Sequence, residues 1–69
     1  MAKDWNEIAG RWTRFSRDVK KKWVELTDDD IMQVNGRREN LAVKIQEKYG
    51  VGSDDAHRQI DAWAAKLKG

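Results

Sequence analysis

Apolar side chains at helical spacing constrain the fold of this chain more than any other feature. At about 100° per residue, a helix gathers side chains that recur every three or four positions on one face, whereas a strand scatters them over both faces. The first 26 residues follow this spacing, with Trp5, Ile8, Trp12, Phe15, Val19, Trp23 and Leu26. The pattern predicts an amphipathic helix over approximately residues 4–25.

Capping signals place the ends of this first helix. Asp4 is suited to the N-cap, and Glu7 follows three residues later, as in a capping box. Gly10 lies inside the pattern, where a glycine either kinks a helix or separates its first turn.

A second helix is predicted over residues 28–35. Thr27 is a hydroxyl cap, and the three aspartates after it occupy the turn where the helix dipole favours negative charge. Leu26 and Ile31 stand where a hydrophobic staple would form, and Val34 also points inward. Asn35-Gly36 is typical of a left-handed helix end. The alternative is a helix that continues through Gly36 into the next segment, and we slightly prefer the break.

Two further helices are predicted, over residues 38–49 and 53–67. Gly50 is expected to end the first, and Ser53 to cap the second. The inward positions are Leu41, Ala42, Ile45 and Tyr49 in the first, and Ala56, Ile60, Trp63, Ala64 and Leu67 in the second. The sequence therefore predicts an all-α fold, a small bundle of three to four short helices that forms one domain over residues 1–69.

Size and composition exclude several classes of protein. A chain of 69 residues has room for one domain, and without cysteine it has no disulfide, thiol nucleophile or cysteine-ligated zinc. Charged residues make up 38% of the chain, and no apolar run approaches the roughly 18 residues that a membrane span needs. The first residues show no secretory signal. We expect a cytoplasmic protein without a transmembrane segment.

The four tryptophans allow two interpretations. Exposed indoles stack on bases or cage ligands, whereas buried indoles supply the core of a small bundle. Trp5, Trp12, Trp23 and Trp63 share the stripes of the aliphatic residues, so we favour the core, with Trp5 as the expected exposed exception.

The residues that carry chemistry do not form a catalytic pattern. His57 lies one helical turn before Asp61, but no nucleophile accompanies them, and a solvated surface histidine is the favoured interpretation. The spacing of Asp28, Asp29 and Asp30 differs from that of a calcium loop, so helix capping explains them better. We predict no enzymatic activity, no cofactor and no metal.

One candidate interaction surface remains. Arg14, Arg17 and Lys21, here called the basic ridge, are predicted to project opposite the apolar stripe, together with Lys3 and flanked by Arg11 and Lys22. Such a ridge suits the phosphates of nucleic acid or an anionic surface. The alternative, which we favour, is a solvated face partly neutralised by two i,i+4 pairs, Glu7 with Arg11 and Asp18 with Lys22.

Two blocks of the sequence resemble a known family. Residues 26–30 read LTDDD, and the glycine at 36 is followed by Leu41 and then by KIQEKYG at residues 44–50. In this combination the chain resembles the CsbD-like family of small bacterial stress-response proteins. The resemblance implies a small cytoplasmic helical protein made under general stress, with no established enzymatic activity and no agreed ligand.

Three functional hypotheses follow. The first is a non-enzymatic, stress-associated protein that acts stoichiometrically. The second is a module that binds nucleic acid or an anionic surface through the basic ridge. The third is a homodimer in which exposed parts of the apolar stripes pair between chains, although we favour a monomer.

Overall fold

The structure, a computed structural model, describes residues 5–67 of the chain. Within these residues it contains no strand, and its helices are α1 (Trp5–Gly10), α2 (Trp12–Lys22), α3 (Asp28–Val34), α4 (Arg38–Tyr49) and α5 (Ser53–Lys66). The predicted all-α class is confirmed, with five helices where the sequence indicated three to four.

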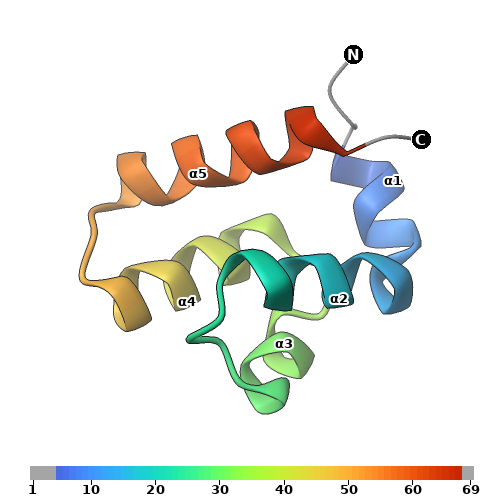
Figure 1. The fold of residues 1–69 in the computed structure, drawn as a ribbon, viewed down its shortest axis with the longest axis horizontal. Coiled ribbons are helices and arrows are strands. Elements are labelled where there is room, and N and C mark those ends of the chain that lie inside the picture. Colours follow the sequence, from blue (N-terminus) through green and yellow to red (C-terminus); the bar gives the residue numbers. More distant parts are fainter. Residues whose placement is uncertain (1–4, 68–69) are drawn as a thin grey trace.

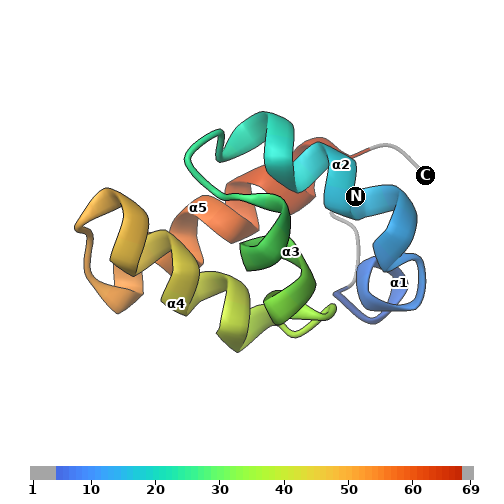
Figure 2. The ribbon, with the colours of Figure 1, turned by 90° about the horizontal axis from the view of Figure 1, so that it is seen from below.

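The helices pack in a simple order (Figure 1). The two longest, α4 and α5, run antiparallel and are joined by a short connector, while α3 packs against α4, and α2 packs against α3 and α1. Figure 2 shows α2, α3 and α4 from below, with α1 at one end of the molecule. The core between them consists of Ile8, Phe15, Val19, Trp23, Leu26, Ile31, Val34, Leu41, Ala42, Ile45, Ala56, Ile60, Trp63 and Ala64.

The helix predicted over residues 4–25 is in fact two helices. The backbone leaves helical geometry at Arg11, with φ −122° and ψ 39°, directly after Gly10. The Arg11 N–H is shared between the carbonyls of Glu7 and Ile8, each at 3.2 Å. Glycine weakens a helix because it gains the most backbone entropy when released, so Gly10 suits this break. The expected cap at Asp4 lies outside the described residues.

The predicted start of α3 is confirmed, and the helix ends at Val34, one residue before the predicted end. The Thr27 hydroxyl accepts a hydrogen bond from the Asp30 N–H, and the Asp30 carboxylate accepts one from the Thr27 N–H, which completes a capping box. Asn35 ends the helix in the left-handed region, with φ 49°. Gly36 follows with φ 75°, and a Cβ there would lie 3.4 Å from the Ala9 carbonyl oxygen. The preferred break before α4 is therefore confirmed.

Two predictions about the later helices are wrong. Gly52, not Ser53, is the N-cap of α5, and no side chain caps that end. Tyr49 was expected in the core but is 38% exposed, because it is the last residue of α4, where the helix reaches past the buried cluster. Its hydroxyl accepts a hydrogen bond from the Glu25 N–H at 3.1 Å. The helix end at Gly50 is as predicted, with φ 66°.

The tryptophans are structural, as expected. Trp23 and Trp63 are buried with ring centroids 5.5 Å apart in an edge-to-face arrangement. Trp5 and Trp12 are half-buried against the core, 6.3 Å apart. Trp5 is less exposed than predicted because its indole N–H donates to the Gly36 carbonyl at 2.9 Å, which ties α1 to the turn before α4.

Candidate functional site

The basic ridge lies on the outer face of α2. Arg14, Arg17 and Lys21 are all exposed. At 100° per residue they fall within an arc of about 60° whose centre is opposite the buried residues of the same helix. Those buried residues are Phe15 and Val19, and they fix the rotation of α2 against the core. The sequence therefore placed the ridge correctly, because its position depends only on the phase of one helix.

Positive charge is concentrated on α2 and its N-cap residue, Arg11. Residues 11–22 contain six basic residues and one acidic residue, a net charge of +5, whereas the rest of the chain has eight basic and eleven acidic residues, a net charge of −3. The near-neutral total of the chain conceals this asymmetry. A surface of one sign attracts an oppositely charged partner over a distance of about one Debye length.

The ridge cations have no acidic partner within the described residues. The two predicted pairs, Glu7 with Arg11 and Asp18 with Lys22, are not among the ion pairs between described residues. Lys20, beside the ridge, instead pairs with Asp28 at the start of α3. The Arg14 guanidinium lies 5.6 Å from the centroid of the Phe15 ring, within the range of a cation–π contact.

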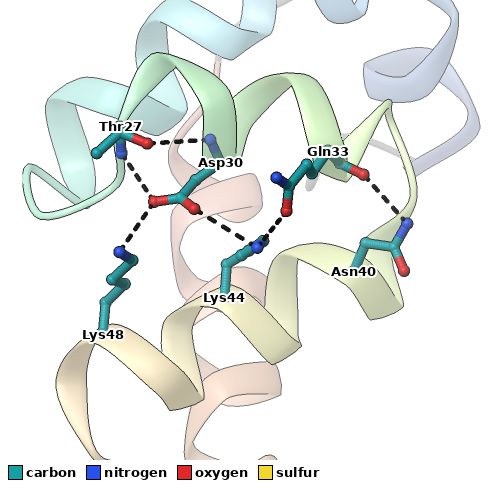
Figure 3. A network of polar contacts seen from close by, with 6 residues as sticks. All are labelled: Thr27, Asp30, Gln33, Asn40, Lys44 and Lys48. Carbon is teal, nitrogen blue, oxygen red and sulfur yellow. Dashed lines mark hydrogen bonds and ion pairs between the residues drawn. The ribbon is translucent and has the colours of Figure 1, made fainter.

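A second charged cluster joins α3 to α4 (Figure 3). The Asp30 carboxylate, in a residue only 7% exposed, lies 3.5 Å from the Lys44 Nζ and 3.4 Å from the Lys48 Nζ. The Lys44 ammonium also donates to the Gln33 side chain, and the Asn40 amide lies 3.4 Å from the Val34 carbonyl oxygen. We call Thr27, Asp30, Lys44 and Lys48 the α3–α4 latch.

The environment of Asp30 favours its ionised form. The hydrogen bond from the Thr27 N–H is the largest influence and lowers the pKa of Asp30 from 3.8 to about 2, assisted by Lys48 and opposed by burial. The capping role predicted for Asp30 is confirmed, but its contacts with Lys44 and Lys48 were not predicted from the sequence. Their four-residue spacing was the available signal, because two like charges one turn apart on a helix repel unless an acid lies between them.

A third polar cluster joins α4 to α5. The Arg38 Nε donates to the His57 Nδ1 at 3.2 Å, and its terminal nitrogen reaches the His57 carbonyl and the Asp61 carboxylate. His57 is half-buried in this contact, so the prediction of a solvated surface histidine is wrong. The pair considered from sequence, His57 with Asp61, is bridged by an arginine from another helix, a contact that depends on how α4 and α5 pack.

Other kinds of site are not found in the described part of the chain. Residues 5–67 form no detectable pocket and contain no group of three or more metal-ligating side chains. Among these residues no helix has the length and apolar character for crossing a membrane.

Several bacterial proteins are similar to this chain. The chain is 45% identical over 65 residues to the UPF0337 protein RPA4217 of Rhodopseudomonas palustris, covering 94% of this chain and 98% of the relative. It is 41% identical over 66 residues to the UPF0337 protein YjbJ of Escherichia coli K12, covering 96% and 93%. It is 37% identical over 60 residues to the UPF0337 protein NE2439 of Nitrosomonas europaea, covering 87% and 64%. No family model matches the chain.

Proposed function

The chain belongs to the UPF0337 family, and from this premise we propose that it is a non-enzymatic, stress-associated protein that acts stoichiometrically through the basic ridge of α2. The resemblance of its LTDDD and KIQEKYG blocks to the CsbD-like family supports the stress setting and a cytoplasmic location. The observation that carries the proposal is the exposed row of cations, in no ion pair among the described residues, on a helix whose other face is fixed in the core.

The distribution of charge partners supports a binding role for this face. Asp28, Asp30 and Asp61 each pair with a cation of another helix, so these acids already have partners within the fold. Arg14, Arg17 and Lys21 contribute no such contact to the described residues. Arg14 lies over the ring of the core residue Phe15, but none of the three cations forms an ion pair among the described residues, so their charge is available to an anionic partner.

Complementation in bacteria tests this function. A strain lacking its UPF0337 gene is supplied with the wild-type chain or with a ridge variant, which combines Arg14→Gln, Arg17→Gln and Lys21→Gln. A control variant with the same loss of charge combines Arg37→Gln, Arg58→Gln and Lys66→Gln, three exposed positions outside α2. Survival is measured after osmotic, heat and stationary-phase stress.

We expect survival to rise in proportion to the amount of wild-type protein, because a stoichiometric protein is used up by its partner. The ridge variant should restore little survival and the control variant should restore most of it. Full protection by a trace of protein, or turnover of a substrate that is lost in His57→Ala, would contradict a non-enzymatic role.

The active unit that we propose is a monomer, and sedimentation at high concentration checks this. Four large apolar side chains are exposed among the described residues, namely Val24, Met32, Val43 and Tyr49. They offer the alternative of a homodimer, which a sedimentation coefficient that rises with concentration would favour.

A further inference from the structure

We infer that the anionic partner of the basic ridge is the phosphate backbone of duplex DNA, bound without regard to base sequence. This inference rests on the proposed function and names the partner of the same surface. Three features of α2 carry it: the spacing of the cations, the burial of the apolar face, and the position of the aromatic residues.

The spacing of the ridge matches a nucleic-acid strand. Arg14 and Lys21 are seven residues apart, which is about 10.5 Å along a helix that rises 1.5 Å per residue. One strand of a DNA duplex carries a phosphate about every 3.4 Å of its axis, so this length spans about three phosphates. The ridge offers three cations over that length, and two of them are arginines, whose planar guanidinium binds a phosphate through two hydrogen bonds.

The buried face of α2 argues against a membrane. A helix that binds at a bilayer surface inserts its apolar side chains between the lipids. Here Phe15 is 3% exposed and Val19 is fully buried, because both belong to the core of the protein. A lipid surface could therefore interact with α2 only through the charged side chains of the ridge. DNA, in contrast, presents its phosphates in a fixed row that a rigid helix can match.

The aromatic residues argue against single-stranded nucleic acid. Proteins that bind single strands place aromatic rings beside their cations, so that successive bases stack on them. On α2 the ring of Phe15 is buried, and Trp12 lies half-buried on the side opposite the ridge, against the core and Trp5. The ridge therefore contacts a backbone and leaves the bases paired.

Salt dependence of binding tests the inference directly. The full chain is titrated into a fluorescently labelled duplex of 20 base pairs from 20 to 200 mM NaCl, and anisotropy gives the dissociation constant. Three phosphate contacts predict a slope of log K against log [salt] of about −2.7, or a loss of about 40-fold in affinity between 50 and 200 mM. Further contacts by Arg11 and Lys22 would make the wild-type slope steeper.

Comparison of the ridge variant (Arg14→Gln, Arg17→Gln, Lys21→Gln) with the control variant distinguishes the loss of ridge contacts from the loss of net charge. Its slope should be less steep than that of the wild type by about 2.7, whereas the control variant (Arg37→Gln, Arg58→Gln, Lys66→Gln) should keep the wild-type slope. Circular dichroism of each variant confirms that the helices are retained. Equal slopes for the two variants, or no binding of duplex at 20 mM NaCl, would overturn the inference.

Parallel titrations show whether single-stranded DNA or an anionic membrane binds more tightly than duplex DNA. Single-stranded DNA of the same length and vesicles with 30% anionic lipid replace the duplex, and the duplex should bind most tightly. Tighter binding to either alternative overturns the assignment to duplex DNA. If the ridge variant fails in complementation but the wild type does not bind DNA, the proposed function stands and only this inference fails.

Discussion

The cations of α4 and those of α2 differ in what surrounds their charge. Lys44 and Lys48 face the carboxylate of Asp30 across the contact between α3 and α4. Arg14, Arg17 and Lys21 face solvent and pair with no acid among the described residues. The same residue types thus serve stability in the latch and remain available for binding on the ridge, so burial and pairing, rather than charge alone, separate the two roles.

Removing the charge of Asp30 should produce the largest loss of stability. In Asp30→Asn the amide keeps much of the shape of the carboxylate, but Lys44 and Lys48 then face each other without a negative charge between them, which is costly in a partly buried site. We expect the urea midpoint to fall further than for any other single substitution discussed here.

Asp29→Asn is the matched control, because Asp29 is the exposed neighbour in the first turn of the same helix. It loses the same charge near the helix dipole without touching the latch. Equal urea midpoints for Asp30→Asn and Asp29→Asn would show that the latch contributes no more to stability than a surface charge does. The difference drawn here between the latch and the ridge would then be wrong.

The pH dependence of stability should show the latch in the wild type. Because the pKa of Asp30 is lowered to about 2 in the folded state, its contribution is fully present above the unfolded value of 3.8 and is lost as the pH falls from there towards 2. The free energies of unfolding of the wild type and of Asp30→Asn, measured with urea at each pH, should therefore converge over this window. A difference between them that stays constant with pH would contradict the role given to Asp30.

Removing the hydroxyl of Thr27 should have a smaller effect. Thr27→Ala loses the side-chain cap on the Asp30 N–H but keeps the lysine contacts, and loss of such a cap costs about 1 kcal/mol in the free energy of unfolding. Thr13→Ala, at an exposed position within α2, controls for the substitution itself and should be neutral or slightly stabilising. A larger loss at Thr13 than at Thr27 would contradict the capping box.

The sequence predicts the ridge better than the latch for a physical reason. The outward direction of Arg14, Arg17 and Lys21 follows from the phase of a single helix, which the apolar stripe defines. The contact of Asp30 with Lys44 and Lys48 depends on how two helices pack, which local spacing does not specify.

A related reason explains why the apolar stripe predicts one helix over residues 4–25, although Gly10 indicated a kink or a separate first turn. Ile8 and Phe15 are seven residues apart and both buried, so the stripe keeps its phase across the break at Arg11. An apolar pattern that continues through a bend predicts which residues enter the core but not that the helix is interrupted. Gly10 was the one local sign of the interruption.

The ridge variant should leave stability nearly unchanged. Exposed side chains outside ion pairs contribute within about 0.5 kcal/mol each, and removing three like charges from one helix relieves repulsion that partly offsets any lost packing. Its urea midpoint should therefore match that of the wild type, while its binding is impaired. A fall as large as that of Asp30→Asn would mean that the ridge supports the fold, and its loss of function in cells would then reflect unfolding instead of a lost contact.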